Sequence, residues 1–233
     1  MASGSRTRGA RIVRSAPWLP LLAGSTAATL LLLGAVAWHG SGFAPVATLL
    51  GLAACGGAAA YVLDEESAVV LDATPTSLAH RVRWRLVLVA MPAAVALTGL
   101  LMLDRLDPST HWLRLAPFAA GCLAIGVVLA AALRRSGNRA PGDLAGVIAV
   151  AVVVLLVATD PLKAWVSVAP LGDTGHVGRT VLLWSAVVLV CAAVTARCSR
   201  DPGVPGAGYS RVSDVEGRLP LHRVARSGGD TPS

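Results

Sequence analysis

Charged residues are scarce in this chain of 233 residues. Lys, Arg, Asp and Glu together make up 14% of it, whereas a soluble globular domain carries about a quarter. Lysine occurs once, as Lys163, and 55% of the residues are hydrophobic, with a mean hydropathy of +0.66. These proportions exclude an ordinary soluble domain and indicate an integral membrane protein.

Motifs for metal binding, disulfide bonding and ATP hydrolysis are absent from the sequence. The four cysteines form no CxxC pair and no cluster with histidine, and three of them lie inside apolar runs, where Cys acts as a small hydrophobe. No GxxxxGK[ST] loop is present, so the chain cannot hydrolyse ATP in the manner of a P-loop protein. No nucleophile has an acid and a base nearby. We therefore predict no catalytic residue, no cofactor, no metal site and no enzymatic activity.

The excess of positive charge does not indicate a nucleic-acid partner. The net charge is +7, but the basic residues are not interleaved with aromatic residues on a polar surface, as a nucleic-acid groove requires. They lie at the ends of apolar runs. We predict that the chain contacts the lipid bilayer and binds no nucleic acid.

Six apolar runs are long enough to be transmembrane helices. A helix needs about 20 predominantly apolar residues to cross a hydrocarbon core about 30 Å thick. The predicted spans are residues 19–38, 43–63, 86–103, 113–133, 144–159 and 180–196, of which the fifth is short. The predicted fold class is all-α, a polytopic membrane protein with six transmembrane helices in a domain at 18–196. Residues 1–17 form a basic N-terminus, and the polar tail 197–233 is predicted to be disordered.

The first apolar run also has features of a secretory signal peptide. It follows a basic start, and Ala35-Val36-Ala37 has the small residues of a cleavage site. The run is longer than a typical signal-peptide core, so we predict that it is retained as a span. Cleavage would remove one span without changing the orientation of the others.

The distribution of arginine and lysine predicts the orientation, because loops rich in these residues stay in the cytoplasm. The N-terminus, the 64–85 loop, the loop between the fourth and fifth spans, and the tail hold most of them. The alternate loops hold only Arg105, Arg114, Lys163 and Arg179. This alternation predicts that both termini are cytoplasmic. The protein is expected to be a multi-pass protein of the bacterial cytoplasmic membrane.

Several features of the spans carry hypotheses about packing. Pro92 lies within the third span and predicts a kink, because proline removes a backbone donor. Two stripes of small residues at four-residue spacing are typical of close helix packing in lipid. The stripes are Gly51, Cys55 and Ala59 in the second span and Ala116, Ala120 and Ala124 in the fourth.

Tryptophan and charged residues lie toward the ends of the predicted spans or outside them. The tryptophans fall at or near span ends, as expected of an interfacial belt. They are Trp18, Trp38, Trp84, Trp112, Trp165 and Trp184. No Asp, Glu, Lys, Arg or His lies within a predicted interior, which argues against a proton-coupled pump. The semi-apolar segment 161–171 is either an ordinary external loop or a segment that re-enters the membrane.

The longest predicted cytoplasmic loop, residues 64–85, reads as two short helices. The first is acidic from Asp64 onward, which suits a helix N-terminus. The second opens near Pro75, with Thr74 or Thr76 as its cap, and runs into the third span. Arg81, Arg83 and Arg85 are expected to reach toward anionic headgroups. The arginines of this loop either enforce the topology alone or belong to a docking element for a cytoplasmic partner.

The loop resembles the one between the second and third spans in actinobacterial ABC-transporter membrane subunits of the ABC-2 type. Those proteins show an acid pair, a leucine, a small residue, a Thr/Ser-Pro pair and an arginine-rich entry to the next span. The matching residues here are Asp64 and Glu65, Leu71, Ala73, Thr74-Pro75, Arg81 and Arg85. Glu66-Ser67 departs from the small residue and proline expected nearby.

The resemblance implies a permease subunit that dimerises with an identical or related chain and is driven by a separate ABC ATPase. The predicted function is the membrane-spanning subunit of an ABC-type exporter. The expected docking residues are Asp64, Glu65, Glu66, Asp72, Thr74, Pro75, Arg81 and Arg85. The alternatives are a small integral membrane protein without transport activity, such as an immunity, regulatory or assembly factor, and an ion-coupled carrier.

Overall fold

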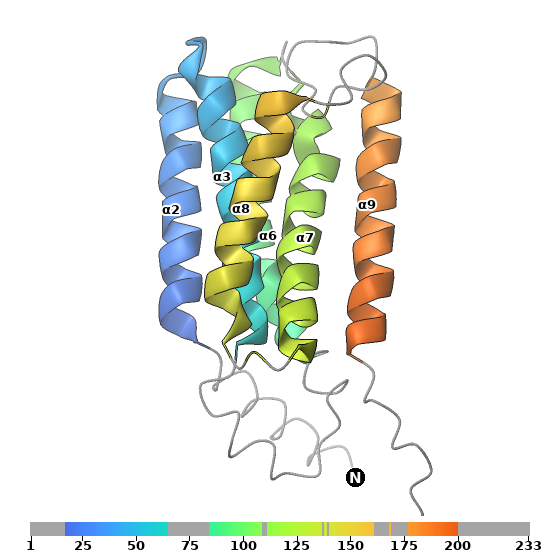
Figure 1. Ribbon diagram of the computed structural model, residues 1–233. Coiled ribbons are helices and arrows are strands. Elements are labelled where there is room, and N and C mark those ends of the chain that lie inside the picture. The colour runs from blue at the N-terminus through green and yellow to red at the C-terminus, as the bar shows by residue number, and fades with distance from the viewer. Residues whose placement is uncertain are drawn as a thin grey trace, which may run out of the picture. The chain divides into compact units, whose positions relative to one another are not determined.

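A computed structural model describes residues 17–64, 84–108, 111–136, 138, 140–160, 168 and 177–199. All regular secondary structure in these ranges is helical, and six helices are long and apolar enough to cross a membrane (Figure 1). The predicted all-α class and the number of candidate spans are confirmed. The orientation of the termini stays a prediction.

The helices begin and end close to the predicted positions. In chain order they are α2 (Trp18–Ala37), α3 (Phe43–Ala60), η1 (Tyr61–Leu63), η2 (Val87–Val89), α6 (Ala90–Leu106), η4 (Trp112–Leu115), α7 (Ala116–Arg135), α8 (Pro141–Thr159) and α9 (Val177–Cys198). The expectation of a short fifth span is wrong, because α8 has 19 residues. Pro141 starts it, and a proline is well tolerated in the first turn of a helix.

Pro92 lies within a helix that is continuous from Trp84 to Leu106. One turn before it, the helix tightens into the 3₁₀ turn η2. Proline has no N–H group to bond to the carbonyl group four residues earlier, which here is that of Leu88 in η2. The irregularity of this span therefore lies where the proline predicts it.

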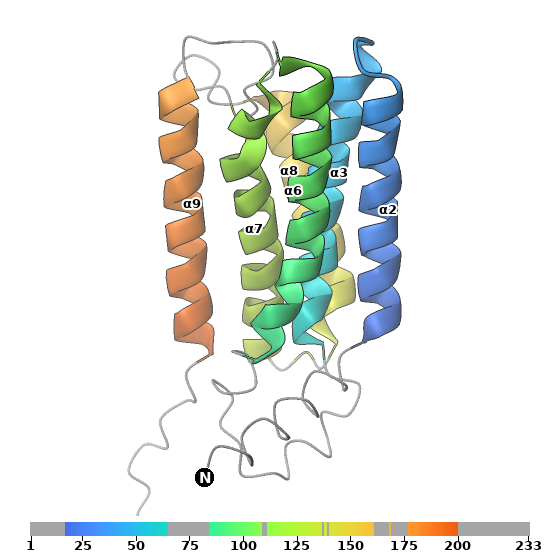
Figure 2. The ribbon, with the colours of Figure 1, turned by 180° about the vertical axis from the view of Figure 1, so that it is seen from behind.

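α3 is the central helix of the bundle. It packs against α2, α6, α7 and α8 (Figures 1 and 2), and 72% of its most apolar stretch is buried. α9 packs mainly against α7, and only 17% of its most apolar stretch is buried. The outer helices expose large apolar side chains such as Leu19, Leu155 and Leu182. These faces suit contact with lipid chains, which are as apolar as leucine.

Glycines allow α3 to approach two neighbours at backbone distance. A Cβ atom on Gly56 would lie 2.5 Å from the carbonyl oxygen of Cys122 in α7, and one on Gly126 would overlap the carbonyl oxygen of Gly56. A Cβ atom on Gly57 would lie 3.0 Å from Val150 in α8. The α3–α7 contact therefore excludes any side chain at Gly56 and Gly126.

The two predicted small-residue stripes differ in their environment. Gly51, Cys55 and Ala59 are buried in α3 as expected. On α7, however, Ala120 is exposed, and the close contact with α3 uses Cys122 and Gly126. Position 122 lies about 200° around the helix axis from position 120, since each residue turns the helix by about 100°. The prediction for the fourth span therefore chose the wrong face.

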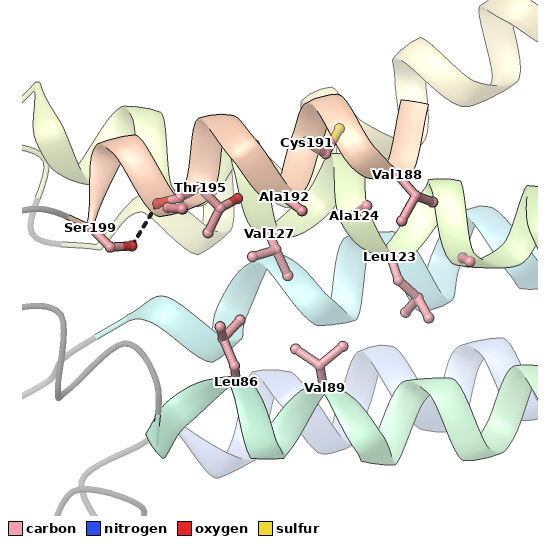
Figure 3. Close-up of a pocket in the computed structure, with 12 residues that line it drawn as sticks. Leu86, Val89, Leu123, Ala124, Val127, Val188, Cys191, Ala192, Thr195 and Ser199 are labelled. Atoms are coloured by element: carbon pink, nitrogen blue, oxygen red, sulfur yellow. Dashed lines mark hydrogen bonds between the residues drawn. The ribbon is translucent and has the colours of Figure 1, made fainter. Parts of the chain in front are cut away.

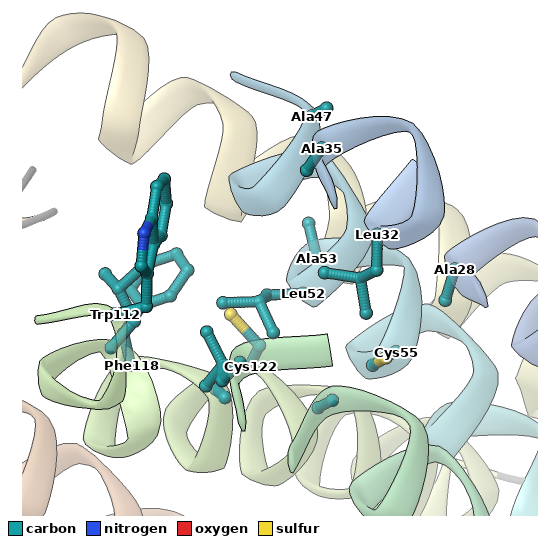
Figure 4. Packing of buried hydrophobic residues seen from close by; sticks show 14 of the residues in the cluster. Ala28, Leu32, Ala35, Ala47, Leu52, Ala53, Cys55, Trp112, Phe118 and Cys122 are labelled. Carbon is teal, nitrogen blue, oxygen red and sulfur yellow. The ribbon is translucent and has the colours of Figure 1, made fainter. Parts of the chain in front are cut away.

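The largest apolar cluster joins side chains from α2, α3 and α7 with residues of the other helices. Figure 4 shows Leu32, Leu52, Cys55, Phe118 and Cys122 gathered around α3. Leu32 also covers two glycines, because Cβ atoms there would lie within 3 Å of its side chain. The first helix is thus packed into the core of the described bundle.

Two tryptophans that were expected at the membrane interface are instead buried in the protein. Trp112 and Trp184 are only 3% and 2% exposed. The ring of Trp184 stands edge-on to Phe118, with centroids 4.8 Å apart, and fills the space left by Gly121. The interfacial prediction fails for these two because neighbouring helices cover them. Trp38 is exposed and fits the prediction.

Candidate functional site

The 64–85 segment joins the bundle through residues at both of its ends. Asp64 follows η1, and Arg85 lies at the start of the third span, and both are buried. The other predicted docking residues lie outside the described residues, and their role stays a prediction. They are Glu65, Glu66, Asp72, Thr74, Pro75 and Arg81.

Two arginines bind the carbonyl groups at the end of the second span. Arg85 donates a hydrogen bond from Nη1 to the carbonyl oxygen of Asp64. Arg134, in the last turn of α7, donates from Nη1 to the carbonyl oxygen of Leu63 over 3.1 Å. The last carbonyl groups of a helix have no helical donor, and arginine side chains can satisfy them. The second span is thereby tied to the third and the fourth.

The carboxylate of Asp64 caps a different helix, α8. The backbone N–H of Gly142 donates to Oδ1 of Asp64 over 2.6 Å, while Ala140, which precedes α8, makes no side-chain cap. An anionic group is favourable at a helix N-terminus because the N–H groups there are unpaired. A Cβ atom on Gly142 would lie 2.7 Å from the ring of Tyr61 and would also overlap the carboxylate. Glycine at position 142 is what permits this contact.

We call Asp64, Arg85, Arg134 and Gly142 the Asp64 cluster. Burial raises the pKa of Asp64 from 3.8 to about 6; the Gly142 N–H opposes this shift, the nearby Asp143 adds to it, and Arg85 and Arg134 oppose it. Tyr61 reaches Asp143 with its hydroxyl group and closes the cluster on the α8 side. Four helix ends therefore meet at a carboxyl group that can change its charge near neutral pH.

The structure corrects the expectation for one arginine of the loop. Arg85 was expected to extend toward lipid headgroups, but its side chain is fully buried and binds the backbone of Asp64. Asp64 is 7% exposed. In this chain, these two predicted docking residues hold the ends of the loop in place. No sequence pattern marks Gly142. Arg134 is one of the basic residues between the fourth and fifth spans, which served only to predict the orientation.

A second polar contact lies at the opposite end of the bundle. The carboxylate of Asp160 accepts a hydrogen bond from the N–H of Val168, over 3.2 Å, and the carbonyl oxygen of Val168 accepts one from Nε1 of Trp184, over 2.9 Å. Val168 is the only described residue of the 161–171 segment. The rest of this segment, which was predicted either to form an external loop or to re-enter the membrane, lies outside the described residues, and Val168 is bound to α9.

Among the described residues are two apolar cavities that no Asp, Glu, Lys, Arg or His side chain lines. One of about 610 Å³ lies between the start of the third span, α7 and α9, and is lined by residues such as Val89, Leu123 and Ala192 (Figure 3). The other, of about 280 Å³, lies between α2 and α6. No group of His, Cys, Asp or Glu in the described ranges could hold a metal ion. No family model matches this chain, and neither a curated protein nor a solved structure is significantly similar to it.

Proposed function

We propose that this chain is the membrane-spanning subunit of an ABC-type exporter and that a separate cytoplasmic ATPase binds its 64–85 segment. The observation that carries the proposal is the Asp64 cluster. It fastens both ends of this segment to four helices, so a force on the segment reaches the bundle through buried polar contacts.

The cluster has the connections that a coupling element needs. Arg85 belongs to the third span, Arg134 to α7 and Gly142 to α8, and all of them meet at the end of the second span. A displacement of Asp64 would therefore change the contacts of three other spans at once. Because such buried polar contacts are costly to leave unsatisfied, the helix ends are expected to move together.

The transport route is proposed to lie between two subunits. Within one chain, the backbones of α3 and α7 touch at Gly56 and Gly126, and α3 and α8 touch near Gly57. The described neighbours of the central helix α3 are in close contact with it at these glycines, and no α3 residue lines either cavity. A second copy, or a related chain, would supply the opposite wall of the route.

The alternative function is that of a small integral membrane protein without transport activity. It is favoured by the same close packing around α3 and by the apolar lining of both cavities. An ion-coupled carrier remains a third hypothesis. If the chain is such a carrier, uptake or efflux of its cargo should stop when the proton gradient is removed, even though ATP is held constant.

Affinity purification from detergent extracts tests the proposal. The wild-type chain should recover a P-loop ATPase, and the double variant Glu65→Gln, Glu66→Gln should recover much less. Asp64 is left unchanged because it is buried and holds α8. The control variant is Asp104→Asn, at the opposite end of the third span. If the wild type recovers no ATPase, the transporter proposal fails. If the double variant recovers as much ATPase as the wild type and Asp104→Asn do, only the docking site is wrong.

A second measurement tests the coupling role of the cluster. Arg134→Gln removes a contact between α7 and the second span without altering the acidic residues. The variant should still bind the ATPase, but transport per ATP hydrolysed in reconstituted vesicles should fall severalfold. Arg114→Gln, at the other end of the fourth span, is the matched control. Unchanged coupling in Arg134→Gln would contradict this role.

A further inference from the structure

The larger apolar cavity forms a groove along one side of the bundle. Its walls are Leu86 and Val89 from the third span, Leu123 and Val127 from α7, and Ala192 and Thr195 from α9 (Figure 3). The groove exists because α9 packs mainly against α7 and leaves the start of the third span uncovered on this side. We call it the η2–α7–α9 groove.

The length of the groove matches one leaflet of a bilayer. On α9 its lining runs from Val188 to Ser199, which is roughly 16 Å at the rise of an α-helix. Half of the hydrocarbon core is about 15 Å deep. The groove is therefore as long as the path of one acyl chain from the headgroup level to the middle of the membrane.

Positive charge lies at the polar end of the groove. Arg135, at the end of α7, has an exposed side chain and lies 11 residues after the lining residue Ala124, which places it on the same face of that helix. It donates a hydrogen bond from Nη1 to the carbonyl oxygen of Arg197, over 3.0 Å, next to the lining residues Ala196 and Ser199. A guanidinium group has five N–H donors, so Arg135 retains donors for a phosphate group.

We propose that the η2–α7–α9 groove binds one anionic phospholipid, with an acyl chain along the groove and the phosphate at Arg135. The apolar walls, the length and the charge at the mouth each match a different part of this ligand. The proposal does not depend on the transport function. It requires only that the helices cross a membrane.

Native mass spectrometry of the purified full-length protein tests the proposal. The protein is equilibrated in detergent with equal amounts of phosphatidylglycerol and phosphatidylcholine that have identical acyl chains. The wild type should retain one phosphatidylglycerol in preference to phosphatidylcholine. Ala192→Leu places extra side-chain volume in the groove and should abolish retention of the lipid. Ala193→Leu, at the neighbouring exposed position outside the lining, should retain it.

The charge at the mouth is tested with a second pair of variants. Arg135→Gln should reduce the preference for phosphatidylglycerol about fivefold, the effect expected of one basic residue near an anionic surface. Arg105→Gln removes the same charge at the opposite end of the bundle and should have no effect. If both variants reduce the preference equally, general electrostatic attraction is responsible and the site is wrong.

Two further outcomes would also overturn the proposal. The first is a wild-type protein that retains no phosphatidylglycerol, a result that depends on no substitution. The second is a dimer that Ala192→Leu dissociates, because the groove would then be covered by a second copy. If Ala192→Leu does not fold, as judged by circular dichroism, Ala196→Leu fills the same groove nearer its mouth. Retention of the lipid by a folded Ala196→Leu would contradict the proposal.

Discussion

Gly126 of α7 lies so close to Gly56 of α3 that a Cβ atom on Gly126 would overlap the carbonyl oxygen of Gly56. The close contact is therefore made by backbone atoms, and no flexible side chain can move away to make room. In lipid, such contacts are a main source of helix association, because burial of apolar surface gives no advantage there. This pair holds the central helix in place.

Gly126→Ala is expected to destabilise the protein by about 1–3 kcal/mol, the cost usual for overpacking. The measurement is the unfolding midpoint in detergent, followed by circular dichroism. Gly178→Ala is the matched control, because a Cβ atom at Gly178 would meet nothing within 4 Å. Alanine also favours a helix more than glycine does, so the control should be neutral or slightly stabilising. Equal effects of the two variants would show that the helices are not in backbone contact.

Asp64 should make the stability of the protein depend on pH. Its pKa in the folded protein is about 6 against an ordinary value of 3.8, mainly because of burial. Protonation of this group therefore favours the folded state, and the stability it contributes is complete below pH 3.8 and lost as the pH rises through about 6. Relative to Asp64→Asn, the wild type should gain stability as the pH falls from 7 to 4, by at most about 1.4 kcal/mol per pH unit.

The check is the difference in unfolding midpoint between wild type and Asp64→Asn, measured across this pH range. Taking the difference removes the contributions of the other titrating groups. Asp104→Asn, near the other end of the bundle, provides the comparison with a carboxylate outside the cluster. A difference that does not change with pH would contradict the assigned environment of Asp64.

The two arginines of the cluster should differ in their importance for stability. Arg85 is fully buried, whereas Arg134 is only half-buried. A buried acceptor that loses its donor costs about 1–3 kcal/mol. We expect Arg85→Gln to lie near the upper value and Arg134→Gln near the lower one, as measured by denaturation in detergent. The reverse order would show that Arg85 is not the main support of the loop.

Trp184 should contribute stability through its N–H group as well as its ring. Trp184→Phe keeps an aromatic ring beside Phe118 but removes the hydrogen bond to the carbonyl oxygen of Val168. We expect a loss of about 1 kcal/mol, which is typical of one hydrogen bond. Trp38→Phe, at an exposed position, is the control. The same loss in both variants would mean that the hydrogen bond to Val168 contributes nothing.

Features that belong to a single helix, such as its position in the chain and its length, were largely predictable from the sequence. The apolar runs predicted six helices, because any segment that crosses lipid must satisfy its own backbone groups. Contacts between helices were not predictable. Gly56 and Gly126 are 70 positions apart, and a stripe of alanines on the other face of α7 looked equally suitable for packing. Small residues are so frequent in this chain that spacing alone cannot select the face that is used.

The Asp64 cluster shows the same limit for polar residues. The sequence drew attention to Asp64 and Arg85 because both lie in a charged loop, and it predicted that they face outward. The structure buries them because the last carbonyl groups of the second span and the N–H groups of α8 need partners. The partner Gly142 has no polar side chain, so no sequence pattern identifies it.

The predicted orientation can be tested at two exposed serines. Ser41 lies in the turn between α2 and α3, and Ser136 follows α7 at the end of the bundle that holds Arg134. Each is replaced by cysteine in a Cys198→Ser background, because Cys198 is the one natural cysteine that is not buried. In intact cells, a membrane-impermeant maleimide should label Ser41→Cys, and should label Ser136→Cys only after the membrane is opened. Labelling in the reverse order would place the 64–85 segment outside the cell. The proposed cytoplasmic ATPase could then not reach it.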